Sequence, residues 1–413
     1  MGSVVRGLRS NHVATPNQGR ITVMSTPDEH RHDRVVGGEH AVTPLELFFD
    51  LVFVFALTQV TTLLAEDLTW IGMLRGFAVL AVIWWAWVGY AWLTNSIRID
   101  DDVVSRLVIM VAMVAMLVVG LAAPAAFGEY ALLFGAAYFV VRVLHVLLYM
   151  IATRSDNDVF GAVLRLTPGM LAAATCILVA GFVPPGPVRA GLWALAIIID
   201  FGTPLLAGTT GWKVDADHFA ERHGLIIIIA LGESVVALGV SAAGEELSAG
   251  IVTAAALGVA VVCAMWWLYF DVVAVVAGRV LASLSGRAQA SMARDSYSYI
   301  HLFMVFGIVL VALGLKKTLL DIYAPLKMVV SVALFGGMAL YLLAHVAFRL
   351  RNIQTVNVQR LVVAAILIAL IPVGALLPSL TSLGILAGAL IALVTYEAIR
   401  FREIRHRIRF DEH

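Results

Sequence analysis

The stretch TPLELFFDLVFVFALTQV, residues 43–60, decides the fold class, because apart from two carboxylates it is an apolar run that can cross a bilayer as a helix. Glu46 and Asp50 are four residues apart, so a helix places them on one face. Ionised carboxylates are costly in hydrocarbon and need a use or a partner there. Glu46 follows Pro44 closely and also suits a helix N-terminus at the cytoplasmic interface. Asp50 lies one turn deeper, which favours an interior site lined by protein.

The rest of the chain repeats this apolar pattern. Of its 413 residues 61% are hydrophobic and 14% are charged, and the mean hydropathy is +0.93. This composition excludes an ordinary soluble protein and predicts an all-α, polytopic integral membrane protein surrounded by the lipid bilayer. Windows of about 20 apolar residues predict about twelve transmembrane helices, at residues 44–64, 70–93, 104–124, 129–152, 165–183, 188–208, 222–240, 250–277, 296–315, 325–348, 358–377 and 382–400.

The basic residues predict the orientation in the membrane. The formal net charge is zero, so no basic face for nucleic acid is expected. Most of the 28 Lys and Arg residues lie in alternate loops and near the two ends, and such segments stay in the cytoplasm. We therefore expect a multi-pass protein of the cytoplasmic membrane with both termini cytoplasmic. Residues 1–40, with a start at Met1 or Met24, lack the apolar run of a signal peptide and are expected to form a disordered cytoplasmic tail. Residues 402–413 are expected to form a basic cytoplasmic tail.

The second half of the chain resembles the first at an offset of about 180 to 200 residues. The aligned pairs are IWWAWVGY (83–90) with MWWLYFDV (265–272), RLVIMVAMVAMLVVGL (106–121) with HLFMVFGIVLVALGL (301–315), RLTPGMLAAATCILVAG (165–181) with RLVVAAILIALIPVGAL (360–376), and His145 with His345. An even number of spans per repeat makes the halves parallel, related by an axis along the membrane normal. The sequence thus predicts two six-helix repeats, 41–208 and 209–401. Extended into the first span, the register aligns Asp50 with Glu233 and predicts a comparable depth for both.

Further acidic side chains fall inside predicted spans. Glu233 lies about 16 Å along its helix from Arg222, so the two cannot pair within that helix. Glu233 then needs water, a proton or another partner, and a structural hydrogen bond to a neighbouring helix is the alternative. Asp200 lies near the middle of the sixth span, where Gly202 and Pro204 could open the helical hydrogen bonding locally.

Cationic candidates lie at similar depths in two other spans. Arg142 and His145 are three residues apart in the fourth span. Arg294, Tyr297 and His301 follow i, i+3, i+7 spacing in the ninth, so they share one helix face. Histidine titrates near neutral pH, and arginine could balance the carboxylates or meet an anionic substrate. The candidate substrate or ion pathway therefore comprises Asp50, Glu233, Glu46, His145, His301, Asp200, Arg142, Arg294, His223 and Tyr297.

Motifs for metal, nucleotide or hydrolytic chemistry do not occur in the sequence, which has no HExxH, no paired Cys motif, no phosphate loop and no Ser/His/Asp spacing. Cys176 and Cys263 lie in apolar spans and are expected to be packing residues. Asp100, Asp101 and Asp102 could bind Mg²⁺, but a solvated charge run is the favoured interpretation. The sequence therefore assigns no metal and no catalytic residue, and it identifies neither a cofactor, a substrate nor an oligomeric state.

Three stretches resemble, in order, the bacterial low temperature requirement A (LtrA) family: ELFFDLVFVFALTQ (46–59), ERHGLIIIIALGES (221–234) and YSYIHLFMVFGIVLVALG (297–314). The resemblance spans residues 40 to 400 and implies a polytopic cytoplasmic-membrane protein, in a family without an established biochemical activity. A fainter resemblance to two-repeat, twelve-span cation channels rests on the FFD element, which here lacks the Ser usual in those channels. The signature positions that the LtrA resemblance carries over are Glu46, Phe48, Phe49, Asp50, His223, Gly232 and Glu233.

Two functions from different classes fit these residues. The leading hypothesis is a transporter or channel, with Asp50 and Glu233 lining a pathway between the repeats and His145 and His301 handling protons. The rival is an intramembrane enzyme that uses the same Asp, Glu and His groups as general acids and bases on a lipid or isoprenoid substrate. A non-catalytic membrane assembly factor is a third hypothesis. A water-accessible route through both faces favours the first hypothesis, and a closed pocket that opens to lipid favours the second.

Overall fold

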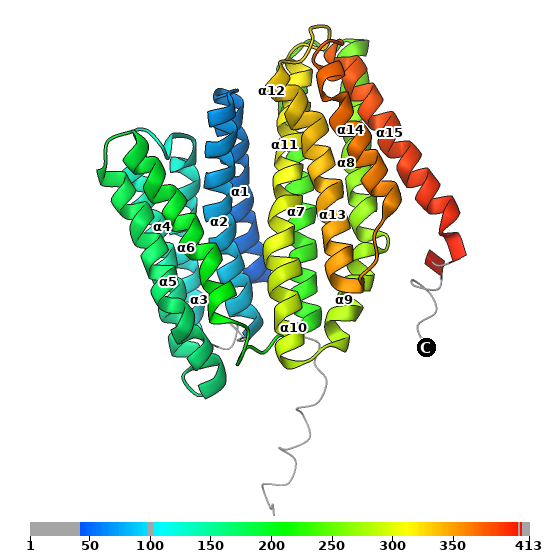
Figure 1. Cartoon of the computed structure of the whole chain (residues 1–413). Coiled ribbons are helices and arrows are strands. Elements are labelled where there is room, and N and C mark those ends of the chain that lie inside the picture. Colours follow the sequence, from blue (N-terminus) through cyan, green and yellow to red (C-terminus); the bar gives the residue numbers. More distant parts are fainter. Residues whose placement is uncertain (1–41, 97–101, 404, 407–413) are drawn as a thin grey trace, which may run out of the picture. The chain divides into compact units, whose positions relative to one another are not determined.

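A computed structural model of the protein describes residues 42–96, 102–403 and 405–406. Within these ranges the chain is helical and contains no strand, which confirms the predicted all-α class (Figure 1). The predicted tail 1–40, the loop residues Asp100 and Asp101, and most of the predicted tail 402–413 lie outside the described residues.

The α-helices follow one another with short connections. They are α1 (Pro44–Glu66), α2 (Trp70–Ser96), α3 (Val103–Ala122), α4 (Ala131–Thr153), α5 (Asn157–Phe182), α6 (Pro187–Ala207), α7 (Ala216–Ala243), α8 (Ala249–Phe270), α9 (Val273–Ser283), α10 (Gly286–Met292), α11 (His301–Leu320), α12 (Met328–Ser331), α13 (Gly337–Ile353), α14 (Val358–Gly374) and α15 (Ser379–Arg400).

Eleven helical segments of the described chain are long and apolar enough to cross a membrane. The remaining predicted span corresponds to α14, which has 17 residues and contains Pro372. At 1.5 Å per residue α14 measures about 26 Å, slightly less than a hydrocarbon core of about 30 Å. Large apolar side chains such as Leu206 (90% exposed) and Phe182 (70%) cover the outside of the helices, as lipid contact requires. The protein is therefore a polytopic membrane protein.

Two helices begin earlier than the apolar windows predict. The carboxylates of Asp156 and Asp215 accept hydrogen bonds from the first backbone amides of α5 and α7, so these helices start at Asn157 and Ala216. Lys213 binds Asp156 and lowers the pKa of that carboxyl below its usual range. Polar caps outside the apolar run extend a helix beyond any hydropathy window.

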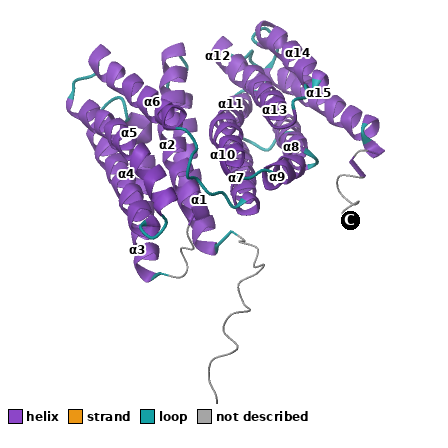
Figure 2. Cartoon of the chain, turned by 60° about the horizontal axis from the view of Figure 1, so that its bottom comes forward, coloured by secondary structure: helices purple, strands orange, loops and turns teal. Residues whose placement is uncertain are grey.

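The helices form two groups, α1–α6 and α7–α15, which meet through α1 and α2 on one side and α7 and α11 on the other. In one group α4 packs on α3 and α5, and α6 packs on α5; in the other, α11 packs on α7 and α13. Contacts of α1 and α2 with α7 and α11 join the groups, as the turned view in Figure 2 shows. In Figure 1 α1 begins and α15 ends toward the same, lower end.

Close helix contact depends on glycine between α11 and α13. A Cβ on Gly307 would lie 2.8 Å from the carbonyl oxygen of Gly337, which is shorter than atoms tolerate. Small residues let membrane helices approach in this way. This contact between α11 and α13 therefore needs a glycine at position 307.

A π-helix, Ala293–Ile300, joins α10 to α11. Two indoles of α2 bind one residue of it: Trp84 Nε1 donates to the carbonyl oxygen of Ser298 at 2.8 Å, and Trp92 Nε1 donates to its hydroxyl at 2.9 Å. The π-helix is thus tied to the other helix group through side-chain hydrogen bonds.

Candidate functional site

The N-terminus of α1 fixes the position of Glu46. Thr43 caps the helix, and the backbone N–H of Thr43 donates to Glu46 Oε2 at 2.9 Å while the Thr43 hydroxyl accepts from the Glu46 backbone N–H. Such a capping box places a carboxylate at the positive end of the helix dipole. Glu46 thus lies at a helix N-terminus, yet its side chain is buried and has further partners.

Arg222 of α7 is the cation that Glu46 and Asp50 of α1 both bind. Its Nη1 donates to Glu46 Oε1 and its Nη2 to Asp50 Oδ1, each at 2.7 Å, and Nη1 also donates to Thr94 of α2 at 3.0 Å. Arg222, Asp50 and Glu46 are all at most 3% exposed. Sequence reasoning missed this role, because it compared Arg222 only with Glu233 on the same helix. The pattern that could have indicated this role is a single arginine at the start of a predicted span that contains no other Lys or Arg.

Asp50 keeps one oxygen without a partner. Its Oδ1 accepts from Arg222 and, at 2.8 Å, from Nε1 of Trp87 on α2. Its Oδ2 is buried and has no hydrogen-bond partner among the described residues. A buried carboxylate oxygen in this condition is costly unless it binds a proton or a ligand.

His218, one turn before Arg222, completes the cluster. Its Nε2 lies 3.1 Å from Glu46, and its Nδ1 lies 3.2 Å from Nδ2 of Asn95. The Oδ1 atom of Asn95 accepts from the backbone N–H of Asp215. Two carboxylates, one guanidinium and one imidazole therefore share this buried cluster.

A cluster of buried histidines and tyrosines lies behind Trp87. The ring of His223 is 5.0 Å from Trp87 and 5.3 Å from His301, measured between ring centroids. Tyr297 stacks on His301 at 5.2 Å, and the hydroxyl of Tyr269 lies 2.9 Å from His301 Nε2. The structure thus brings His223, Tyr297 and His301, all predicted candidates, into one cluster.

Glu233 lies farther along α7 than this cluster. It is 8% exposed and lies beside Thr58 of α1 and within electrostatic range of Lys316. Thr58 is two turns beyond Asp50, about 12 Å along the helix. The two carboxylates therefore lie at different depths, contrary to the alignment of Asp50 with Glu233.

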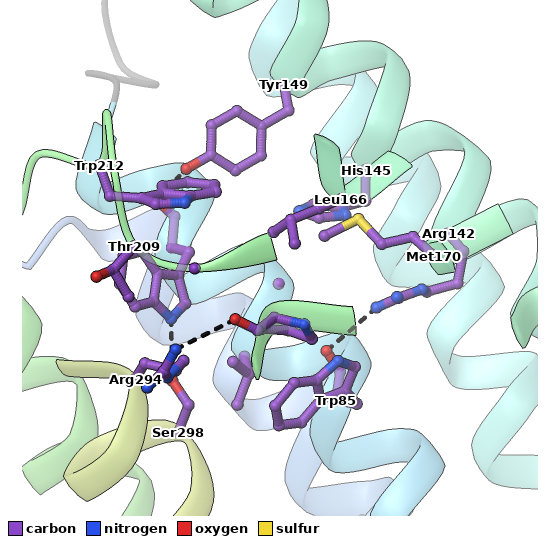
Figure 3. Close-up of a pocket in the computed structure, with 15 residues that line it drawn as sticks. Trp85, Arg142, His145, Tyr149, Leu166, Met170, Thr209, Trp212, Arg294 and Ser298 are labelled. Atoms are coloured by element: carbon purple, nitrogen blue, oxygen red, sulfur yellow. Dashed lines mark hydrogen bonds between the residues drawn. The ribbon is translucent and has the colours of Figure 1, made fainter. Parts of the chain in front are cut away.

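The other predicted residues gather around a separate pocket of about 60 Å³, which is lined by residues of α2, α4 and α5 and of the π-helix (Figure 3). Arg142 pairs with Asp200 at 2.6 Å and donates to the carbonyl of Trp85, and Tyr138 donates to Asp200 at 3.1 Å. Both partners of the ion pair are less than 5% exposed. Arg142 therefore balances Asp200 and does not bind Asp50 or Glu233.

His145 and Arg294 line the same pocket. The ring of His145 lies against Gly89, and neither ring nitrogen has a hydrogen-bond partner among the described residues. Arg294 donates to Asp295 at 2.7 Å and to the carbonyl of Pro204 at 3.2 Å. These residues therefore lie apart from the cluster around Arg222. The sequence analysis had placed all of them in one pathway.

Comparison with known proteins identifies the chain. Residues 41–395 match the family described as bacterial low temperature requirement A protein (LtrA). The chain belongs to the LtrA family. A relative, the protein named "Uncharacterized protein RA0937" of Rhizobium meliloti (strain 1021), is 28% identical over 310 residues, which cover 72% of this chain and 74% of that protein. The LtrA match includes the α1 and α7 residues that meet at Arg222.

Proposed function

We propose that this LtrA protein is a proton-linked membrane transport protein, a transporter or channel, in which Asp50 is the group that binds and releases the proton. The observation that carries the proposal is the unpartnered Oδ2 of Asp50 in a buried site where two carboxylates share one guanidinium. A buried carboxylate oxygen without a partner gains from taking up a cation. A proton is the cation that needs no further ligands.

The proton is assigned to Asp50 because Glu46 is better stabilised as an anion. Glu46 accepts from Arg222, from His218 and from the backbone at the start of α1. Among the described residues, Asp50 accepts through one oxygen alone. Hydrogen bonds to the charged form favour that form, so the first proton goes to Asp50.

The histidine cluster supplies the next groups on a path away from Asp50. His223, His301 and His345 each direct Nδ1 to a backbone carbonyl, so in the neutral ring Nε2 is the acceptor. Nε2 of His301 accepts from Tyr269, and the Tyr269 ring is 5.9 Å from that of His345. Small ring motions would carry a proton along this set of acceptors.

The helix packing supports an arrangement of two six-helix repeats, 41–208 and 209–401. The contact of α1 with α3 corresponds to that of α7 with α11, and the contact of α3 with α4 to that of α11 with α13. The Arg222 cluster then joins the first helices of the two repeats. Movement of one repeat against the other would break or remake these ion pairs and so couple to the proton on Asp50.

Reconstitution into liposomes tests the proposal. With a pH-sensitive dye inside and a panel of ions and metabolites outside, the wild type should move protons when its substrate is present. Asp50→Asn should abolish proton movement, and Glu46→Gln should reduce it less. Glu66→Gln, an exposed carboxylate at the other end of α1, is the matched control. Proton movement by Asp50→Asn at the wild-type rate would refute the role of Asp50.

A further inference from the structure

A second, larger pocket of about 340 Å³ lies in the other helix group, where α8, α13 and α15 end and α14 begins. Most of its wall is apolar, with Trp267, Val276 and Phe348 among the lining residues. Three arginines and two carboxylates stand at this pocket: Arg349, Arg360, Arg405, Asp271 and Glu397. It therefore combines an apolar chamber with a charged group of residues.

Two of the arginines are held by the two carboxylates. Arg360 donates to Glu397 at 2.8 Å and to the carbonyl of Leu268 at 3.0 Å. Arg405 pairs with Asp271 at 2.6 Å. Arg349 donates through Nε to Thr355 and, within the described part of the chain, forms no ion pair. The pocket therefore keeps one uncompensated positive charge.

One face of α13 presents further unsatisfied polar atoms to this pocket. His345, Arg349 and Asn352 follow i, i+4, i+7 spacing and all line it. Nε2 of His345, a residue 1% exposed, and Nδ2 of Asn352 have no hydrogen-bond partner among the described residues. Since Nδ1 of His345 donates to the carbonyl of Tyr341 at 2.8 Å, Nε2 of the neutral ring is an acceptor. The site thus offers donors, a positive charge and one acceptor.

We propose that this pocket binds a phosphate monoester joined to an apolar chain. A phosphate monoester loses its second proton near pH 6, so it is mostly a dianion at neutral pH, and a minor fraction is the monoanion that carries an acidic O–H beside anionic oxygens. The site would select this monoanion. The O–H can donate to His345 Nε2, while the anionic oxygens accept from Arg349 and Asn352. A carboxylate or a phosphate diester lacks the O–H and would leave His345 without a partner. The apolar wall accommodates the chain. The site shares His345 with the proposed proton path, whereas Arg349 and Asn352 are not part of that path.

Ligand binding to the full-length protein in detergent tests this assignment. Native mass spectrometry should detect dioleoyl phosphatidic acid bound at least tenfold more tightly than dioleoyl phosphatidylmethanol, a diester without the O–H. Arg349→Gln should weaken phosphatidic acid binding at least tenfold. Arg402→Gln removes an exposed arginine near the same end that does not line the pocket, and it should bind as the wild type does.

Three results would overturn the proposal. They are equal binding of the monoester and the diester, equal binding by Arg349→Gln and Arg402→Gln, and binding of inorganic phosphate as tight as that of the lipid. The last would show that the apolar wall contributes nothing. If Arg349→Gln does not elute as a monodisperse protein, Asn352→Ala replaces it, and the same tenfold loss is expected.

Discussion

Asp50 of α1 and Arg222 of α7 form a buried ion pair of 2.7 Å between residues 172 positions apart in the chain. Glu46 binds the same guanidinium, so one side chain of α7 holds two turns of α1. The two acids in the opening stretch of the sequence therefore have a partner. Of the three residues, Arg222 is the one whose charge balances the other two.

Replacing Arg222 should destabilise the protein strongly. Arg222→Gln leaves two buried carboxylates without a cation, and removal of one partner from a buried ion pair costs about 3–5 kcal/mol. Thermal unfolding followed by fluorescence-detected size-exclusion chromatography should show much less folded protein. Arg154→Gln, which removes an exposed arginine, is the control. Recovery of folded protein in the double variant Arg222→Gln/Asp50→Asn is expected, and an unchanged single variant would contradict the charge argument.

Asp50→Asn should leave the protein folded. Arg222 keeps its bonds to Glu46 and Thr94, and an amide is cheaper to bury than a carboxylate. Glu233→Gln should also fold, because no ion pair within 4 Å holds Glu233 in the described chain. We expect both variants at near-normal levels in the membrane but without transport or cold-growth activity. Loss of both proteins from the membrane would instead assign the carboxylates a role in stability.

The pair Arg142–Asp200 permits a test of buried charge in the first helix group. Either Arg142→Met or Asp200→Leu should cost about 3–5 kcal/mol, whereas the double variant should be close to the wild type in stability. Unfolding midpoints of the three variants measure this in a double-mutant cycle. Additive losses in the double variant would show that the two side chains act separately.

Glycine at position 307 should be required for the contact of α11 with α13. Gly307→Ala places a methyl group against the Gly337 carbonyl and should destabilise by about 1–3 kcal/mol. Gly239→Ala on α7 is the control, because a Cβ there meets no atom within 4 Å. Since alanine favours helices over glycine by about 1 kcal/mol, the control should be as stable as the wild type or more so.

Topology can be tested with reporter fusions. The Lys and Arg distribution predicts both termini in the cytoplasm, and α1 begins and α15 ends toward the same end of the helices (Figure 1). A C-terminal fusion to an enzyme active only outside the cytoplasmic membrane should be inactive. Strong activity would overturn the predicted orientation and the parallel repeats.

Hydropathy predicted the helices well because each needs its own apolar run to cross lipid. It extended the predicted span 358–377 beyond the end of α14 at Gly374, because the apolar pattern continues past Pro372 and does not show the turn that ends the helix. The polar clusters could be predicted only in part. Arg142 and Asp200 were recognised as buried, but their pairing depends on how α4 and α6 are rotated, which local periodicity does not determine. The same holds for Arg222, whose partners lie on a distant helix.

The π-helix Ala293–Ile300 holds one more residue than an α-helical path of the same turns requires. A slide of one residue into α-helical register would turn the side chains of α11 by about 100°. His301, now within reach of Tyr269, would then face another neighbour. Trp84 and Trp92 hold Ser298 against such a slide. The register of the π-helix, and with it the neighbour that His301 meets, is therefore fixed by the tryptophans of the opposite helix group.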